Sequence, residues 1–148
     1  MPSHGAGAWL VWLAALGLLL LAGPGLRGER IVGGVQEVPI SDPGVQAAVR
    51  FAVEAYNRAS NSLRYCRAER VLRARSQVVA GMKYYLTVQL VTTQCQKNRA
   101  GLGNVDISTC PLPPTSEQQK LLCEFQVWSR PWLNQTQLLS QNCSVFES

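Results

Sequence analysis

Five cysteines and a single histidine are the residues of this 148-residue chain that are best suited to chemistry. The histidine, His4, lies ahead of a long apolar run, and no other histidine follows it. A Cys-His or Ser-His nucleophile pair needs an imidazole, and the common zinc sites need imidazole or closely spaced cysteines, which are absent from the sequence. The sequence therefore favours a binding protein over an enzyme, and it predicts no metal or other cofactor.

The apolar run from Trp9 to Ala22 is uncharged and shorter than the roughly 20 residues that a membrane-spanning helix needs. With the small residues that follow, it predicts a signal peptide over residues 1–28, cleaved near Gly25 or Gly28. Residues 29–148 would then form one secreted, extracellular domain without a membrane anchor.

In that oxidising compartment the cysteines indicate a disulfide framework with one thiol left over. Neighbour pairing among Cys95, Cys110, Cys123 and Cys143 would close two short loops, each bridge contributing about 3 kcal/mol, but the spacing leaves other pairings open. Cys66 is then either a buried free thiol or the site of an intermolecular bridge.

The candidate binding surface is a short apolar stretch, Gln77-Val78-Val79-Ala80-Gly81, between two runs with strand character. This arrangement predicts a β-hairpin in which Gly81 supplies the unusual backbone dihedral angles of the turn. Hairpin turns are normally polar, so valines at the tip indicate a surface that a partner covers. Alternatively, the valines belong to the core of a longer strand.

The two runs that must position this turn are Tyr65 to Ser76, which is rich in arginine, and Lys83 to Val91. The arginines could bind a polyanion, but Glu69 interrupts them and strand alternation splits them between two faces. The formal net charge is +5, one less if Arg27 leaves with the signal peptide. This charge suits a soluble secreted protein and does not require nucleic acid as a partner.

One amphipathic helix precedes these strands. Ser41 or Asp42 is a favourable N-cap, and Pro43 fits the first turn. About four helical turns that end near Ser60-Asn61-Ser62 follow from the helical spacing of the apolar residues Val45, Val49, Phe51, Ala52, Val53 and Tyr56.

The rest of the chain predicts further antiparallel strands. Gln96 to Leu112 is a disulfide-tied excursion, Lys120 to Trp128 resumes strand character, Ser129 to Trp132 interrupts it, and Leu133 to Cys143 is the last strand. One helix followed by antiparallel strands indicates an α+β fold in which the sheet wraps the helix.

At the other end of the predicted domain, Glu29 to Val35 combines the apolar residues Ile31 and Val32 with a Gly33-Gly34 hinge. This segment would be mobile alone and could lie extended along a partner, or it could form an edge strand of the sheet.

Together these motifs resemble a type 2 cystatin, a secreted inhibitor of papain-like cysteine proteases. The resemblance rests on Val32-Gly33-Gly34, Gln77 to Gly81, Pro131-Trp132 and the four later cysteines, in the order found in that family. Within the family, Asn104 to Leu112 and Pro131 to Asn134 are most similar to the cystatin E/M subfamily.

The resemblance implies a cystatin fold, with a five-stranded antiparallel sheet around one long helix and disulfides Cys95–Cys110 and Cys123–Cys143. It places three segments along one wedge-shaped edge, which enters the cleft of a papain-like protease such as a cathepsin and blocks it reversibly. The wedge residues are Ile31, Val32, Gly33, Gln77, Val78, Val79, Ala80, Gly81, Pro131 and Trp132.

Two further sites are predicted. The resemblance implies that Asn61, beyond the helix, binds the asparaginyl endopeptidase legumain; the alternative is an ordinary Asn at a helix C-terminus. Asn134-Gln135-Thr136 is a predicted N-glycosylation site, and Asn142-Cys143-Ser144 fits the same pattern.

We expect mainly a monomer, with a domain-swapped dimer opened at Val79 or a Cys66-linked dimer as alternatives. The competing function is that of a secreted protein with the cystatin fold that acts in signalling, or as a defence-peptide precursor, without inhibiting proteases.

Overall fold

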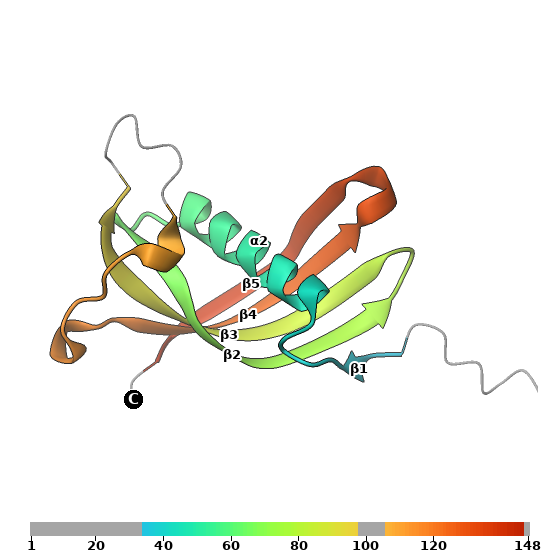
Figure 1. The fold of residues 1–148 in the computed structure, drawn as a ribbon, viewed down its shortest axis with the longest axis horizontal. Coiled ribbons are helices and arrows are strands. Elements are labelled where there is room, and N and C mark those ends of the chain that lie inside the picture. The colour runs from blue at the N-terminus through green and yellow to red at the C-terminus, as the bar shows by residue number, and fades with distance from the viewer. Residues whose placement is uncertain (1–33, 98–105, 147–148) are drawn as a thin grey trace, which may run out of the picture. The chain divides into compact units, whose positions relative to one another are not determined.

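The computed structural model describes residues 34–97 and 106–146, which belong to one unit, Gly33–Ser148. Helix α2 lies against a single antiparallel sheet with the strand order β1-β2-β3-β4-β5, and the sheet curves around it (Figure 1). The predicted α+β architecture is therefore confirmed. The elements are β1 (Gln36–Glu37), α2 (Pro43–Ala59), β2 (Arg64–Val78), β3 (Met82–Gln96), β4 (Lys120–Arg130) and β5 (Gln135–Phe146), with short 3-10 turns η2 (Ile107–Thr109), η3 (Thr115–Glu117) and η4 (Pro131–Leu133).

Helix α2 begins and ends where local signals predict. The Asp42 carboxylate accepts a hydrogen bond from the Val45 amide at 3.1 Å, and Pro43 occupies the first turn, where a missing amide costs nothing. At the other end, Lys97 Nζ donates to the carbonyls of Asn57 (2.6 Å) and Ser60 (3.1 Å), which satisfies two of the last carbonyl groups. The buried face consists of Val45, Ala48, Val49, Ala52, Val53 and Asn57.

The sheet supplies the other half of the core. Alternate residues of β3, from Tyr84 to Leu90, point towards α2, and Phe125 and Val127 of β4 lie beside them with exposed fractions of 1% or less. Burial of each such side chain contributes about 1.5 to 3 kcal/mol to folding. The core therefore holds the helix against β3 and β4, the two strands that continue into the hairpin turns.

Both disulfides join the cysteines that the resemblance paired. Cys95–Cys110 ties the end of β3 to η2, and Cys123–Cys143 links β4 to β5. The fifth cysteine, Cys66, is a free thiol within this chain and is 2% exposed, as the buried-thiol interpretation predicts.

The strand ends at the two hairpins differ from those that the sequence predicted: β2 and β4 extend further, and β5 begins later. Val78 pairs with Met82, so the first turn contains only residues 79–81 and not the whole stretch from Gln77. Strand β4 continues through Ser129 and Arg130, which we expected to interrupt it, because both pair with β5. Strand β5 begins at Gln135 instead of Leu133, since Pro131–Leu133 forms the 3-10 turn η4.

The edge strand β1 comprises Gln36 and Glu37, which pair with Ser76 and Arg75 of β2. The predicted signal peptide, the apolar residues Ile31 to Gly33 and the glycine-rich part of the excursion before Cys110 lie outside the described residues. Within the described part of the chain, no helix is both long and apolar enough to cross a membrane.

Candidate functional site

The first hairpin turn presents an apolar tip with a constrained backbone. Ala80 and Gly81 have positive φ angles of 41° and 121°, and the Val79 amide donates to the Gly81 carbonyl at 3.0 Å. The φ of Gly81 is one that a residue with a side chain rarely adopts. Val78 is 57% exposed although it belongs to β2, so it does not join the core as the alternative interpretation required.

The second hairpin turn, η4, exposes larger apolar side chains. Trp132 is 64% exposed and Leu133 is 50% exposed. Asn134 closes the turn in the left-handed conformation, with φ of 50°, and its amide donates to the Pro131 carbonyl at 2.9 Å. A rigid turn thus holds an indole in solvent, where burial against a partner would return about 1.5 to 3 kcal/mol.

Strand β4 fixes the first turn beside the second. The Trp128 indole Nε1 donates to the Val79 carbonyl at 3.2 Å, and the Arg130 guanidinium lies 4.1 Å from the centre of the Trp128 ring. Gly81 packs so closely on this strand that an added Cβ would lie 2.5 Å from the Ser129 carbonyl oxygen. The two turns therefore form one preorganised unit at the same end of the sheet (Figure 1).

The third segment of the predicted wedge lies outside the described residues. Strand β1 runs antiparallel to β2, and Gln36 pairs with Ser76. The described chain preceding Gln36 consists of half-buried Gly34 and exposed Val35, which is 44% exposed. The placement of Ile31, Val32 and Gly33 beside the hairpins remains a prediction.

Sequence reasoning missed the supporting residues Trp128 and Arg130. Trp128 was expected only as part of a strand, because nothing in the sequence pairs its indole with a carbonyl 49 residues away. The useful signal would have been the register of β4: Met82 pairs with Ser129, which brings the residues around Ser129 next to the first turn.

The exposed tips of the two turns offer apolar side chains, an indole and backbone amides. Such a surface binds by shape and by burial of apolar area. In residues 34–97 and 106–146, no three His, Cys, Asp or Glu side chains group closely enough to hold a metal ion.

Asn61 lies in the exposed connection between α2 and β2. Strand β2 runs from Arg64 at this connection to Val78 at the first hairpin, a path of up to about 45 Å. The connection between α2 and β2 is therefore at the opposite end of the sheet from the two turns (Figure 1). Local hydrogen bonds order the connection: the Ser62 amide donates to Ser60 Oγ at 3.1 Å, and Ser62 Oγ donates to the Arg64 carbonyl at 3.1 Å.

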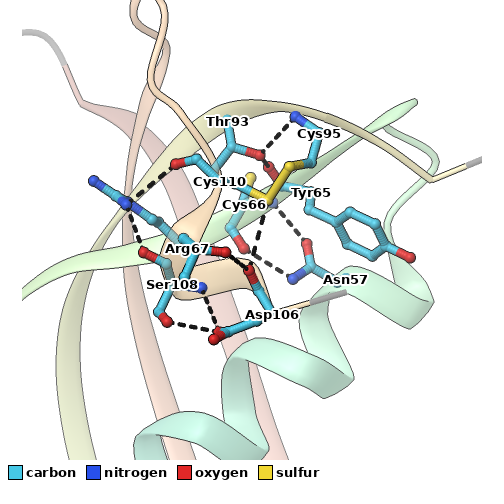
Figure 2. The surroundings of a disulfide bond; sticks show 10 residues. Asn57, Tyr65, Cys66, Arg67, Thr93, Cys95, Asp106, Ser108 and Cys110 are labelled. Carbon is cyan, nitrogen blue, oxygen red and sulfur yellow. Dashed lines mark hydrogen bonds between the residues drawn. A yellow bond between two sulfur atoms is a disulfide. The ribbon is translucent and has the colours of Figure 1, made fainter. Parts of the chain in front are cut away.

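A buried polar pair anchors this connection to the body of the domain. The Asn57 side chain exchanges two hydrogen bonds of 2.9 Å with the backbone amide and carbonyl of Cys66 (Figure 2). Burial raises the pKa of the Cys66 thiol, although a hydrogen bond with Thr92 opposes this change. A Cys66-linked dimer would therefore require this region to open first.

The disulfide-tied excursion is held against β2 beside this anchor. Arg67 Nη1 donates to the carbonyls of Ser108 (3.0 Å) and Cys110 (3.2 Å), and Asp106 caps η2 through the Ser108 amide at 3.1 Å (Figure 2). This arginine, which the sequence offered as a possible polyanion contact, thus has an internal structural partner.

Comparison with known proteins defines the class to which this fold and site belong. The family profile described as "Cystatin domain" matches residues 33–132. The chain is 47% identical over 132 residues to cystatin-1 of Crotalus adamanteus, covering 88% of this chain and 94% of that protein. It is 50% identical over 116 residues to a cystatin of Naja kaouthia, covering 77% of this chain and 82% of that protein.

A solved structure has the same fold. The crystal structure of dimeric human cystatin F superposes with a TM-score of 0.70 and 29% sequence identity, covering 82% of this chain and 94% of that one. The chain belongs to the cystatin family. Members of this family are inhibitors of cysteine proteases and are not enzymes.

Proposed function

We propose that this chain is a secreted type 2 cystatin, of the E/M kind, that reversibly inhibits papain-like cysteine proteases of the cathepsin class by occluding their active site. The observation that supports this proposal is the exposed Val78 beside the first turn and the exposed Trp132 in the second, with the first turn held to β4 by the Trp128–Val79 hydrogen bond. The proposed contact surface consists of Ile31, Val32, Gly33, Gln77, Val78, Val79, Ala80, Gly81, Pro131 and Trp132.

Preorganisation gives this surface its affinity. Burying an exposed Trp132 or Val78 against a cleft returns about 1.5 to 3 kcal/mol each, and rigid turns lose little further conformational freedom on binding. A protease cleaves an extended segment, whereas the turn at Val79 to Gly81 has two successive positive φ angles. The turn therefore fills the cleft without presenting a substrate strand.

The test is titration of papain with the secreted protein and with a variant that lacks residues 1–32. We expect the full protein to inhibit reversibly and the truncated one to inhibit more weakly, chiefly through faster dissociation, with an unchanged thermal unfolding midpoint. A folded protein that leaves papain fully active would overturn the proposal and favour signalling or a defence-peptide precursor instead.

We propose Asn61 as a second inhibitory site, directed at legumain. The supporting observations are the exposure of Asn61 on an ordered connection and its distance from the two hairpins, which allows both proteases to bind together. Asn61→Ala should abolish legumain inhibition and spare papain inhibition. Ser62→Ala is the control for a general disturbance of the connection; if it also removes legumain inhibition, Asn61 is not the specific contact.

The assembly and modification of the secreted protein form the last part of the proposal. We propose a monomer that carries a glycan on Asn134, an exposed residue beside Trp132. A domain-swapped dimer opened at Val79 would lose the first turn and with it papain inhibition. Mass spectrometry before and after enzymatic glycan removal, and titration of chromatographically separated monomer and dimer, test these points.

A further inference from the structure

The outer face of the sheet, away from α2, carries a row of cations and aromatic rings near the hairpins. Arg75 and Lys83 both lie over the Tyr85 ring, at 5.5 Å and 4.9 Å from its centre, and Arg130 lies 4.1 Å from the centre of the Trp128 ring. We define these five residues as the basic-aromatic row. Arg75 Nε is buried without a hydrogen-bond partner among the described residues, so the terminal nitrogens of Arg75, together with Lys83 and Arg130, are the groups that can meet an anion.

The strand register spaces the row regularly. Arg75 on β2 pairs with Tyr85 on β3, Lys83 is two residues closer to the hairpin, and Lys83 in turn pairs with Trp128 on β4. Arg130 is two residues further along the same face. With strands about 4.8 Å apart and a rise of about 3.3 Å per residue, the three cations follow a diagonal with steps of about 8 Å.

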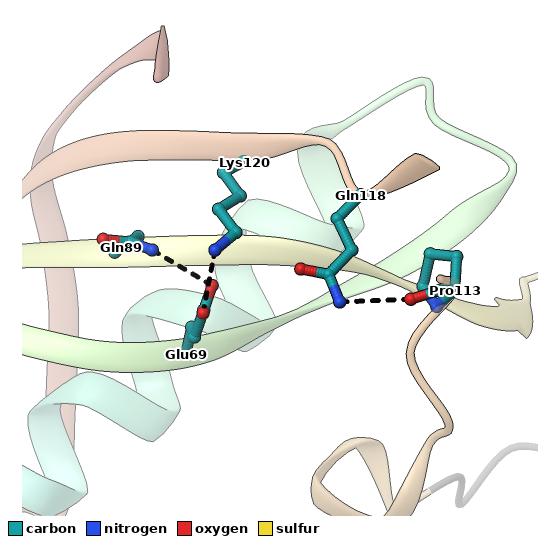
Figure 3. A network of polar contacts seen from close by, with 5 residues as sticks. All are labelled: Glu69, Gln89, Pro113, Gln118 and Lys120. Carbon is teal, nitrogen blue, oxygen red and sulfur yellow. Dashed lines mark hydrogen bonds and ion pairs between the residues drawn. The ribbon is translucent and has the colours of Figure 1, made fainter. Parts of the chain in front are cut away.

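Unlike two other cations of the same sheet, the three cations of the row have no ion-pair partner within the described residues. Arg73 pairs with Glu37, and Lys120 pairs with Glu69, whose other oxygen accepts from Gln89 (Figure 3). Within the described residues, Arg75, Lys83 and Arg130 form no ion pair.

The surroundings of the row are polar and carry little negative charge. A hollow of about 170 Å³ beside Arg75 and Tyr85 is lined by the hydroxyl and amide residues Thr87, Gln126, Ser140 and Asn142 and by the carboxylate of Glu124. Of the three cations, Arg75 lines this hollow, which contains one carboxylate. By register, Arg75 also pairs with Glu37, whose carboxylate is bound by Arg73, whereas Lys83 pairs with Gln77 and Trp128 pairs with Gln137.

We propose that the basic-aromatic row binds a linear sulfated polysaccharide, a glycosaminoglycan of the extracellular matrix. Regularly spaced cations on an open strand face match a polymer whose sulfates recur along its length, and aromatic rings and amides suit the sugar rings between them. Contact with such a ligand in the organism depends on the proposed secretion, but the binding itself is independent of protease inhibition.

The experiment is chromatography of the full chain, expressed through a secretory host, on immobilised heparin. The variant Arg75→Gln/Lys83→Gln/Arg130→Gln removes the cations of the row. The matched control Arg50→Gln/Arg58→Gln/Arg64→Gln removes the same charge from exposed arginines of α2 and the start of β2, which also form no ion pair within the described residues.

We expect the unmodified protein (the parent) and the control variant to stay bound to the column at 0.15 M salt, roughly physiological ionic strength. The row variant should elute at a salt concentration below 0.15 M, roughly that same ionic strength. In solution, the slope of log affinity against log salt should fall by about 2 to 3 for the row variant, by the counterion-release relation known from nucleic acids. Desulfated heparin should compete poorly with heparin for the parent.

Two results would overturn the proposal. Equal losses of retention in the row variant and the control would indicate a response to net charge alone. Unchanged heparin binding by the row variant would show that the row is not the polysaccharide site, whatever its effect on papain inhibition. A thermal unfolding midpoint within a few degrees of the parent establishes that the row variant is folded.

Discussion

At Gly81, the addition of one methyl group should weaken protease inhibition much more than it lowers the stability of the fold. Its φ of 121° disfavours any residue with a side chain, and a Cβ there would lie 2.5 Å from the Ser129 carbonyl oxygen and 2.9 Å from Arg130 Cγ. Gly81→Ala must therefore either strain the turn in place or move it away from β4.

The turn should move, because movement costs less. Holding Ala at this φ costs on the order of 1 to 3 kcal/mol before the contact with Ser129 is counted. Moving the turn breaks the hydrogen bond from Trp128 to Val79, which contributes about 0.5 to 1.5 kcal/mol. We therefore expect the free energy of unfolding to fall by only about 1 to 2 kcal/mol.

Inhibition should suffer more than stability. A displaced turn no longer matches the second hairpin in shape, and a loss of about 1.4 to 2.8 kcal/mol of binding energy raises the inhibition constant tenfold to a hundredfold. Steady-state titration of papain and urea unfolding of the same preparation measure the two effects.

Gly44→Ala is the matched control, since it adds the same methyl group at another crowded glycine. Gly44 lies in the first turn of α2, and a Cβ there would collide with the hydroxyl of Tyr84 on β3. Gly44 itself is remote in sequence from the first hairpin turn. We expect lower stability and an inhibition constant within a factor of about three of the parent value. If Gly81→Ala inhibits papain as well as the parent does, the turn is not part of the contact surface.

Three further results are expected. Trp132→Ala should raise the inhibition constant about thirtyfold, or 2 kcal/mol, and change stability by less than about 0.5 kcal/mol because the indole is 64% exposed; a large drop in stability with unchanged inhibition would contradict this. Cys66 should react with a thiol reagent about a hundredfold faster in urea than in buffer, since its thiol is buried; equal rates would show that the thiol is accessible in the native protein. For Glu69, burial raises the pKa but hydrogen bonds from Lys120 and Gln89 outweigh it, so the pKa lies below its ordinary value. The resulting stabilisation, about 0.5 kcal/mol for a pair this exposed, is present above the unfolded-state pKa near 4.3 and lost as pH falls through the folded-state value. Urea unfolding should therefore show a smaller difference between Glu69→Gln and the unmodified protein at pH 3 than at pH 7.

The elements that the sequence predicted correctly are those whose signals are local. Asp42 and Pro43 cap α2 through contacts within one helical turn, and the apolar spacing of the helix depends only on its own period. Gly81 likewise marks the first turn because its backbone conformation is a property of that residue. Each of these inferences needed no knowledge of what packs against the segment.

The strand ends that were predicted too short lie where a neighbouring strand decides the conformation. Val78, Ser129 and Arg130 look like turn residues in isolation, but each is held in the sheet by a residue on another strand. The positive φ of Ala80 could not be predicted from its residue type, because alanine disfavours the left-handed region.

The same distinction explains why the shape of the proposed wedge could not be predicted from its own motif. The five residues Gln77 to Gly81 specify a hairpin, but the direction of that hairpin depends on Met82 pairing with Ser129 and on Trp128 reaching Val79. Trp128→Phe would keep the ring and its packing while removing the indole donor, leaving the Val79 carbonyl to water. A higher inhibition constant with an unchanged unfolding midpoint would then show that β4 sets the shape of the first turn. An unchanged inhibition constant would show that the turn keeps its shape without this hydrogen bond.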